Sequence, residues 1–135
     1  MIKSTLLIAP AALLALSGCQ AKMEDGEYVS RAPAAKVVGD AVDCLPITSI
    51  RSSTVHDDYT IDFESGGKIW RNTLPHRCPS LGFEKAFTYE TSLSSLCSTD
   101  IIYVLRNVGG RHERGAGCGL GSFVPVELVK PEEEG

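Results

Sequence analysis

The sequence lacks most of the patterns by which an enzyme or a metal protein is recognised. It has three histidines and one tryptophan among 135 residues, and no histidine has a second ligand at metal spacing. It contains no G-x4-G-K-[ST] phosphate loop, no G-x-S-x-G nucleophile turn and no catalytic cysteine signature. These absences argue against P-loop nucleotide binding and against hydrolase chemistry. We therefore predict a protein that is not an enzyme and that holds neither metal nor cofactor.

An excess of positive charge is also missing. The whole chain carries 13 Lys and Arg against 17 Asp and Glu, and within residues 43–130 nine bases stand against ten acids. Such a near-neutral body does not provide the basic surface that nucleic-acid binding needs, so no nucleic acid is expected as a partner. Much of the acidic excess lies in residues 131–135, which are predicted to form a solvated acidic tail.

The longest apolar run is too short to cross a bilayer as a mature helix. Lys3 precedes it, residues 6–16 are apolar with a break at Pro10, and the small residues Ser17 and Gly18 follow. A positive residue, an apolar stretch and small residues at a cleavage point are the parts of a secretory signal. We predict that residues 1–18 are a signal peptide.

The stretch LSGC at residues 16–19 resembles the lipobox of bacterial lipoproteins. In that class the cysteine thiol receives a diacylglyceryl group, the chain is cut before the cysteine, and the new amino terminus is usually acylated. The resemblance implies lipidation at Cys19 and a firm membrane anchor, because several acyl chains hold far better than one. Gln20 stands where an aspartate would direct retention in the inner membrane. We expect a lipid-anchored protein that faces the periplasm, on the outer membrane rather than the inner one.

Export also explains the odd number of cysteines. With Cys19 used for lipidation, the four that remain are Cys44, Cys78, Cys97 and Cys118. They are at least 19 residues apart in sequence, whereas a structural zinc site uses pairs separated by a few residues. An oxidising periplasm and a small domain both favour disulfides. We predict two disulfides, each of which would stabilise the domain by roughly 3–4 kcal/mol.

The direction of the strands limits how these cysteines can pair. Three antiparallel strands between Cys44 and Cys78 would leave these two residues about 20–25 Å apart, too far for a bond. If the strand after residues 79–87 continues the meander, the pairs are Cys44–Cys97 and Cys78–Cys118. If residues 79–87 cross to the other end of the sheet as a helix, the pairs are Cys44–Cys118 and Cys78–Cys97. The first arrangement is the preferred one.

The mature chain is predicted to consist of a tether and one β domain. Residues 19–42 show no sustained period and are expected to form a flexible tether, with room for a short helix at residues 34–38. Alternating apolar and polar residues over residues 47–72, with glycines at 66–67, predict a three-stranded meander whose second turn is a two-residue hairpin. This meander opens the domain, which we place at residues 43–130.

The second half of the domain has weaker signals. A helical turn is expected within residues 78–87, a serine-rich turn region at 92–98 and a glycine-rich loop at 109–121. Short strands are expected around residues 88–91, 100–105 and 123–129, where β-branched and aromatic residues gather. The predicted fold class is mainly β: a small antiparallel barrel or sandwich with a short helical turn and two disulfides.

Four stretches of the domain carry a further resemblance. They are CLPITSIRSSTVHDDYTIDF at residues 44–63, WRNTLPHRCPSL at 70–81, LCSTDII at 96–102 and GAGCGLGSF at 115–123. Together they are similar to a family of small bacterial envelope proteins that is catalogued as a domain of unknown function. The similarity covers about residues 43–126 and implies an envelope location but no activity.

Trp70 and Arg71 are candidates for binding. If Trp70 is exposed beside Tyr59 and Arg71, the three side chains form a small recognition patch, since aromatic and arginine residues concentrate binding energy. The alternative is that Trp70 packs in the core or at the end of a barrel.

Arg111 and Arg114 are the second pair of candidates, because arginines among glycines could hold an anion with the help of backbone N–H groups. The simpler interpretation is a flexible loop that follows a tight path around a disulfide. The segment His56–Asp58 is expected to be a solvated turn, and Asp62 and Glu64 the solvent face of a strand.

The leading functional hypothesis is a non-catalytic binding or assembly module. Its partner would be another envelope protein or a component of the cell wall. One alternative is an inhibitor that pushes the loop at residues 109–121 into the cleft of a cell-wall hydrolase. A second alternative is a small enzyme that acts on wall or lipid fragments.

Overall fold

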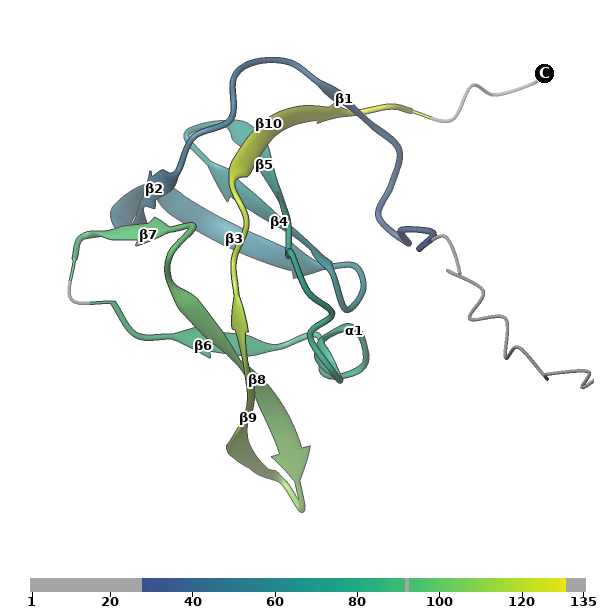
Figure 1. Ribbon diagram of the computed structural model, residues 1–135, viewed down its shortest axis with the longest axis vertical. Coiled ribbons are helices and arrows are strands. Elements are labelled where there is room, and N and C mark those ends of the chain that lie inside the picture. Colours follow the sequence, from purple (N-terminus) through teal and green to yellow (C-terminus); the bar gives the residue numbers. More distant parts are fainter. Residues whose placement is uncertain (1–27, 92, 131–135) are drawn as a thin grey trace, which may run out of the picture.

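The computed structural model describes residues 28–91 and 93–130. The predicted signal peptide, Cys19 and the acidic tail lie outside the described residues. Within them the chain forms short strands, one 3-10 turn (Ile47–Ser49) and one short helix (Figure 1). In chain order these elements are β1 (Ala35–Val37), β2 (Cys44–Pro46), β3 (Ile50–Val55), β4 (Thr60–Ser65), β5 (Lys68–Thr73), α1 (Leu81–Glu84), β6 (Phe87–Tyr89), β7 (Ser95–Cys97), β8 (Ile101–Val108), β9 (Arg111–Gly119) and β10 (Phe123–Leu128).

The prediction of a mainly β fold with a short helical turn is confirmed. All strand pairs are antiparallel and form sheets of five, three and two strands, in the orders β1-β10-β5-β4-β3, β6-β8-β9 and β2-β7. The arrangement fits a sandwich rather than a closed barrel. Elements of the smaller sheets and of α1 pack on the inner face of the large sheet.

The predicted meander is confirmed in β3, β4 and β5. Ile61 and Phe63 of β4 point inward and are fully buried, and Phe63 lies opposite Trp70 of β5. The chain reverses between β4 and β5 at Gly66 and Gly67, whose φ angles of 61° and 77° are left-handed conformations that glycine adopts without strain. The alternating pattern of the sequence therefore set this part of the fold.

The core lies between the large sheet and the elements that cover it. The ring of Phe63 packs edge-on against Phe123 of β10 and Phe87 of β6, with centroids 5.4 and 6.0 Å apart. Ile102 and Val104 of β8 close the core from the opposite side, and both are fully buried. Burial of large side chains such as these contributes roughly 1.5–3 kcal/mol each.

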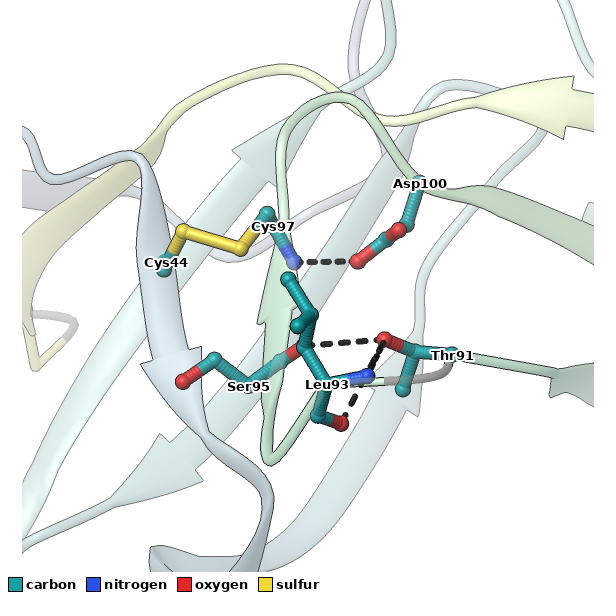
Figure 2. Close-up of a disulfide and its surroundings, with 6 residues drawn as sticks. All are labelled: Cys44, Thr91, Leu93, Ser95, Cys97 and Asp100. Carbon is teal, nitrogen blue, oxygen red and sulfur yellow. Dashed lines mark hydrogen bonds between the residues drawn. A yellow bond between two sulfur atoms is a disulfide. The ribbon is translucent and has the colours of Figure 1, made fainter.

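The preferred disulfide pairing is confirmed. Cys44 and Cys97 lie directly opposite each other in the β2–β7 pair, with Cα atoms 4.0 Å apart (Figure 2). The Asp100 carboxylate accepts the N–H of Cys97 at 2.6 Å and so closes the turn after β7. The sequence did not predict the β7 strand, because its three residues lie within the serine-rich region 92–98, which is typical of a turn when no distant partner strand is known.

The second disulfide joins Cys78 to Cys118, whose Cα atoms are 5.7 Å apart. It connects the segment before α1 to β9. The predicted continuation of the meander after α1 is wrong, because β6 pairs with β8 in another sheet. The predicted connectivity of the cysteines is nevertheless confirmed.

Residues 28–42 differ from the predicted tether, because they pack on the domain. Ala35–Val37 is a strand instead of part of a short helix, and it lies antiparallel to β10 with Val37 opposite Val126. Val42 also forms a bridge with Phe123. No periodicity could reveal this strand, because three residues at a sheet edge are held by a partner almost 90 positions away. Residues 19–27 of the predicted tether lie outside the described residues.

The expectation of a flexible loop at residues 109–121 was wrong. Gly109 and Gly110 form a two-residue turn with φ angles of 59° and 80°, and β9 returns along β8 as a hairpin. Gly115 and Gly117 inside β9 mark close packing instead of looseness. A Cβ on Gly117 would lie 3.1 Å from the ring of Tyr103, which covers it from the neighbouring strand.

Candidate functional site

A cleft of about 620 Å³ lies at one end of the domain. We call it the N-terminal cleft. Its first wall is made by Tyr28, Val29 and Arg31, its floor by the turn between β3 and β4, and its second wall by the region of α1. Those last two parts contribute Asp57, Asp58, Tyr59, Arg77, Gly82, Phe83 and Lys85.

Asp57 attaches the first wall to the floor. One of its carboxylate oxygens accepts the N–H of Tyr59 at 2.8 Å, and the other accepts the N–H of Arg31 at 2.9 Å and the Ser30 hydroxyl at 3.2 Å. The Asp57 residue is only 7% exposed. The local bond to Tyr59 is an Asx turn, the conformation for which aspartate is favoured in turns.

These contacts determine the ionisation of Asp57. Burial alone would raise its pKa, but hydrogen bonds from the Tyr28 hydroxyl and from the backbone of Tyr59 and Arg31 outweigh burial and lower the pKa to about 2. The same environment raises the pKa of Tyr28, through burial and through its hydrogen bond to Asp57. Asp57 is therefore a carboxylate at neutral pH.

Asp58 attaches the second wall to the floor. Its carboxylate accepts the N–H of Gly82 at 2.8 Å and pairs with the Nε of Arg77 at 2.9 Å, while its backbone carbonyl accepts the N–H of Cys78. The helix approaches the turn so closely that a Cβ on Gly82 would lie 2.9 Å from the Cα of Asp57. Glycine is needed here because only hydrogen fits between the two backbones.

The expectation of a solvated turn at residues 56–58 was wrong for Asp57. The Asx turn could have been predicted from the sequence, since the side chain of an aspartate in a turn commonly accepts a hydrogen bond from the backbone N–H two residues later. The hydrogen bond from the Arg31 N–H to the Asp57 carboxylate could not be predicted in this way, because the two residues are 26 positions apart.

The walls of the cleft present apolar and aromatic groups. The Tyr28 ring packs on the Tyr59 ring with a centroid distance of 4.2 Å. Val29 is 80% exposed and Phe83 is 86% exposed, on opposite walls of the cleft. A phenylalanine this exposed contributes little to the core, and its side chain is accessible to a ligand in the cleft.

The free charges of the cleft are cationic. Both carboxylates are engaged, Asp57 with backbone and hydroxyl groups and Asp58 with Arg77 and Gly82. Within residues 28–91 and 93–130, Arg31 and Lys85 form no ion pair. The arrangement suits a ligand that offers an anionic group next to an apolar surface.

Trp70 and Arg71 do not come together, because neighbouring residues of β5 face opposite sides of the sheet. Trp70 is half-buried against the core, and its Nε1 donates to the carbonyl oxygen of Ser65 at 3.2 Å. Arg71 lies on the outer face. The recognition patch that would combine both side chains with Tyr59 is therefore not formed.

Arg71 instead makes a forked pair with Asp62. Its Nε and Nη2 donate to the two carboxylate oxygens at 2.8 and 2.9 Å, and the Nε2 of His56 lies 2.9 Å from the same carboxylate. Hydrogen bonding to Asp62 raises the pKa of Arg71 against the opposing effect of burial. The expectation that Asp62 lies on the solvent face of its strand was wrong, since it is only 6% exposed; Glu64 is exposed as expected.

Arg111 and Arg114 lie on the β8–β9 hairpin, which extends beyond the rest of the fold (Figure 1). Arg114 pairs with Glu90 at 2.9 Å and stacks over the Tyr103 ring at 4.4 Å. Arg111 follows the glycine turn and lies opposite Val108, and both are exposed. Arg114 is thus committed to its neighbours, while Arg111 is exposed at the tip.

The chain matches no protein-family model, no curated protein and no solved structure. The resemblance to an envelope family therefore stays a prediction. Across the described ranges, no helix has the length and hydropathy needed to span a membrane. No group of three or more His, Cys, Asp or Glu side chains is placed to hold a metal ion within those same ranges.

Proposed function

We propose that the protein is a lipid-anchored binding module of the bacterial envelope. Cys19 holds it on the periplasmic side of the outer membrane, and the N-terminal cleft binds a partner without catalysing a reaction. The observation that supports this proposal is that the acidic and the other side chains of the cleft have different roles. Its acids hold the walls together, whereas its exposed aromatic, aliphatic and cationic groups stay available for a ligand.

These different roles favour ligand binding over acid–base catalysis. A general acid or base needs a pKa near the working pH and access to the substrate. Asp57 is buried, receives several hydrogen bonds and has a pKa of about 2, so it is a poor proton donor or acceptor at neutral pH. Arg31 and Lys85, in contrast, are exposed and can attract an anionic group on the ligand.

The position of the cleft along the chain also supports the proposal. Tyr28, on the first wall, follows Cys19 by nine residues. At about 3.5 Å per extended residue, the connection reaches no more than about 30 Å. A protein acylated at Cys19 would therefore keep this cleft close to the membrane surface, where it could meet other envelope components.

Photo-crosslinking in intact cells tests the proposal. A photoreactive residue replaces Phe83 in the cleft, and a second variant carries it at Ser53, an exposed position of β3 outside the cleft. We expect a discrete adduct from position 83 that is weakened by Arg31→Gln and Lys85→Gln, and none from position 53. The same adducts from both positions, or none from position 83, would contradict a binding site in the cleft.

The hairpin supports a second candidate function, the inhibition of a cell-wall hydrolase. Residues 106–114 are exposed throughout, and the hairpin that turns at Gly109–Gly110 extends beyond the rest of the fold (Figure 1). Rates of wall hydrolysis by purified muramidases and amidases, measured with and without the protein, test this function. Inhibition that disappears with Val108→Ala and Arg111→Ala would support it, and unchanged hydrolysis would exclude these enzymes as targets.

A further inference from the structure

We infer that the ligand of the N-terminal cleft is the phospholipid surface of the membrane that carries the protein. The cleft would receive anionic headgroups between its cations, and Val29 and Phe83 would enter the boundary between headgroups and acyl chains. This inference rests on the proposed binding role of the cleft. It adds that the domain is held against the bilayer by a surface of its own as well as by its anchor.

The apolar part of this surface has the form of a membrane contact. Val29 and Phe83 are 80% and 86% exposed and stand on two walls of one cleft. Aromatic and aliphatic side chains that flank cationic ones are what peripheral proteins place in a bilayer interface. Phe83 is almost fully exposed and lines the same cleft as Tyr28, the first described residue after Cys19. An exposed aromatic side chain therefore lies on the part of the domain that is connected to the proposed anchor.

The charged part of the surface is complementary to phosphate. Arg31 and Lys85 are exposed and unpaired in the described part of the chain, and Arg77, which pairs with Asp58, keeps its side chain 65% exposed. Guanidinium and ammonium groups are the usual partners of phosphate oxygens. The cleft is lined by three cations (Arg31, Arg77 and Lys85) and two carboxylates (Asp57 and Asp58), so its net charge is positive.

The chain connection favours the membrane over a soluble anionic partner. The nine residue-to-residue steps from Cys19 to Tyr28 reach about 30 Å at most, which is comparable to the thickness of the hydrocarbon core of one bilayer. Because Tyr28 is itself part of the cleft, an anchor at Cys19 keeps this face of the domain within about 30 Å of the lipid. A ligand on the far side of the periplasm would be poorly placed for it.

Binding to vesicles tests the inference without the anchor. The chain from Gln20 onward is suitable, because both disulfides and all three sheets lie within residues 28–130. Its partition into phosphatidylcholine vesicles is compared with that into vesicles that also contain phosphatidylglycerol. We expect binding that increases with phosphatidylglycerol and that decreases with added salt.

Charge variants separate the cleft from net charge. Arg31→Gln combined with Lys85→Gln is expected to weaken binding by about 25-fold, at about fivefold for each cation near an anionic surface. The matched control is Arg51→Gln combined with Lys36→Gln, which removes the same charges from exposed positions outside the cleft. Equal losses in both pairs, or no preference for phosphatidylglycerol, would overturn the inference.

The depth of Phe83 gives a second measurement. In a Phe83→Trp variant, brominated acyl chains should quench the added fluorescence, whereas Trp70 of the unmodified chain should stay unquenched. An unquenched Trp at position 83 would overturn the inference, as would a protein adduct in place of lipid from the photoreactive residue at position 83. An unmodified Cys19 in the native protein would remove the anchor from the proposed function but would leave the vesicle results unchanged.

Discussion

The carboxylate of Asp57 accepts the backbone N–H of Arg31 at 2.9 Å, and this hydrogen bond attaches the chain that enters the domain to the turn between β3 and β4. The two residues are 26 positions apart. Through this contact one wall of the N-terminal cleft is held in place by a buried carboxylate. Stability, the shape of the cleft and acid sensitivity are therefore coupled at Asp57.

The first prediction concerns acid. The pKa of Asp57 is about 2 in the folded protein against an ordinary value of 3.8, so its contribution to stability is complete above about pH 4. This contribution to the free energy of unfolding is about 2 kcal/mol. It is lost as the pH falls from about 4 to about 2, because in this interval the Asp57 carboxylate takes up a proton when the protein unfolds. Denaturant unfolding with intact disulfides, measured over this interval, should show a smaller decrease for Asp57→Asn. Parallel curves for both proteins would contradict the assignment.

The second prediction concerns Gly82. An added Cβ would lie 2.9 Å from the Cα of Asp57, so Gly82→Ala must displace α1 or the turn. We expect a loss of about 1–3 kcal/mol in the free energy of unfolding, as for other overpacked sites. Gly119→Ala is the matched control, because nothing lies within 4 Å of its added Cβ, and it should change stability by less than about 0.5 kcal/mol.

The third prediction concerns the pair of Arg71 and Asp62. Arg71→Ala leaves a mostly buried carboxylate with only His56 beside it, so we expect a loss of about 3 kcal/mol in the free energy of unfolding. Asp62→Asn combined with Arg71→Gln removes both charges and should cost less than Arg71→Ala. A double-mutant cycle measures the coupling. Additive losses would show that the forked contact contributes nothing specific.

The fourth prediction concerns the disulfide between Cys78 and Cys118. Replacement of both residues by Ala opens a loop of 40 residues and should lower the free energy of unfolding by about 3–4 kcal/mol. Peptide mapping without reduction should recover Cys78 with Cys118 and Cys44 with Cys97. A peptide that joins Cys44 to Cys78 would contradict the fold as well as the pairing.

The fifth prediction concerns Cys19. Mass spectrometry of the membrane fraction should find a mature chain that begins at Cys19 and carries acyl mass. Cys19→Ala should leave the chain unprocessed, because the lipid is attached before cleavage in lipoproteins. A mature chain that begins elsewhere, or an unmodified thiol, would exclude the anchor.

Local patterns determined the meander of β3, β4 and β5. Alternation along β4 places Ile61 and Phe63 on one face, and two adjacent glycines at Gly66 and Gly67 supply the turn that returns the chain. These signals lie within a few residues of the contacts that they specify. The three strands predicted between Cys44 and Cys78 likewise excluded a bond between these two residues.

Only the tertiary structure decided the elements whose partners are distant in sequence. The strand β1 exists because it lies beside β10, and β7 because it lies beside β2. The hairpin strand β9 looked like a loop, since glycine is a poor strand residue; its Gly117 is required because the Tyr103 ring covers it. The sequence shows that residue 117 is glycine, but it does not show that the Tyr103 ring packs against it.

The cleft divides in the same way. The sequence by itself determined the Asx turn of Asp57 and the short distance from Cys19 to Tyr28 along the chain, because both depend on neighbouring residues. The placement of Tyr28 and Phe83 around one cleft, and the burial of Asp57 in its floor, came only from folding. The physical reason is that burial and long-range hydrogen bonds arise from the packing of segments, and no single segment contains both partners.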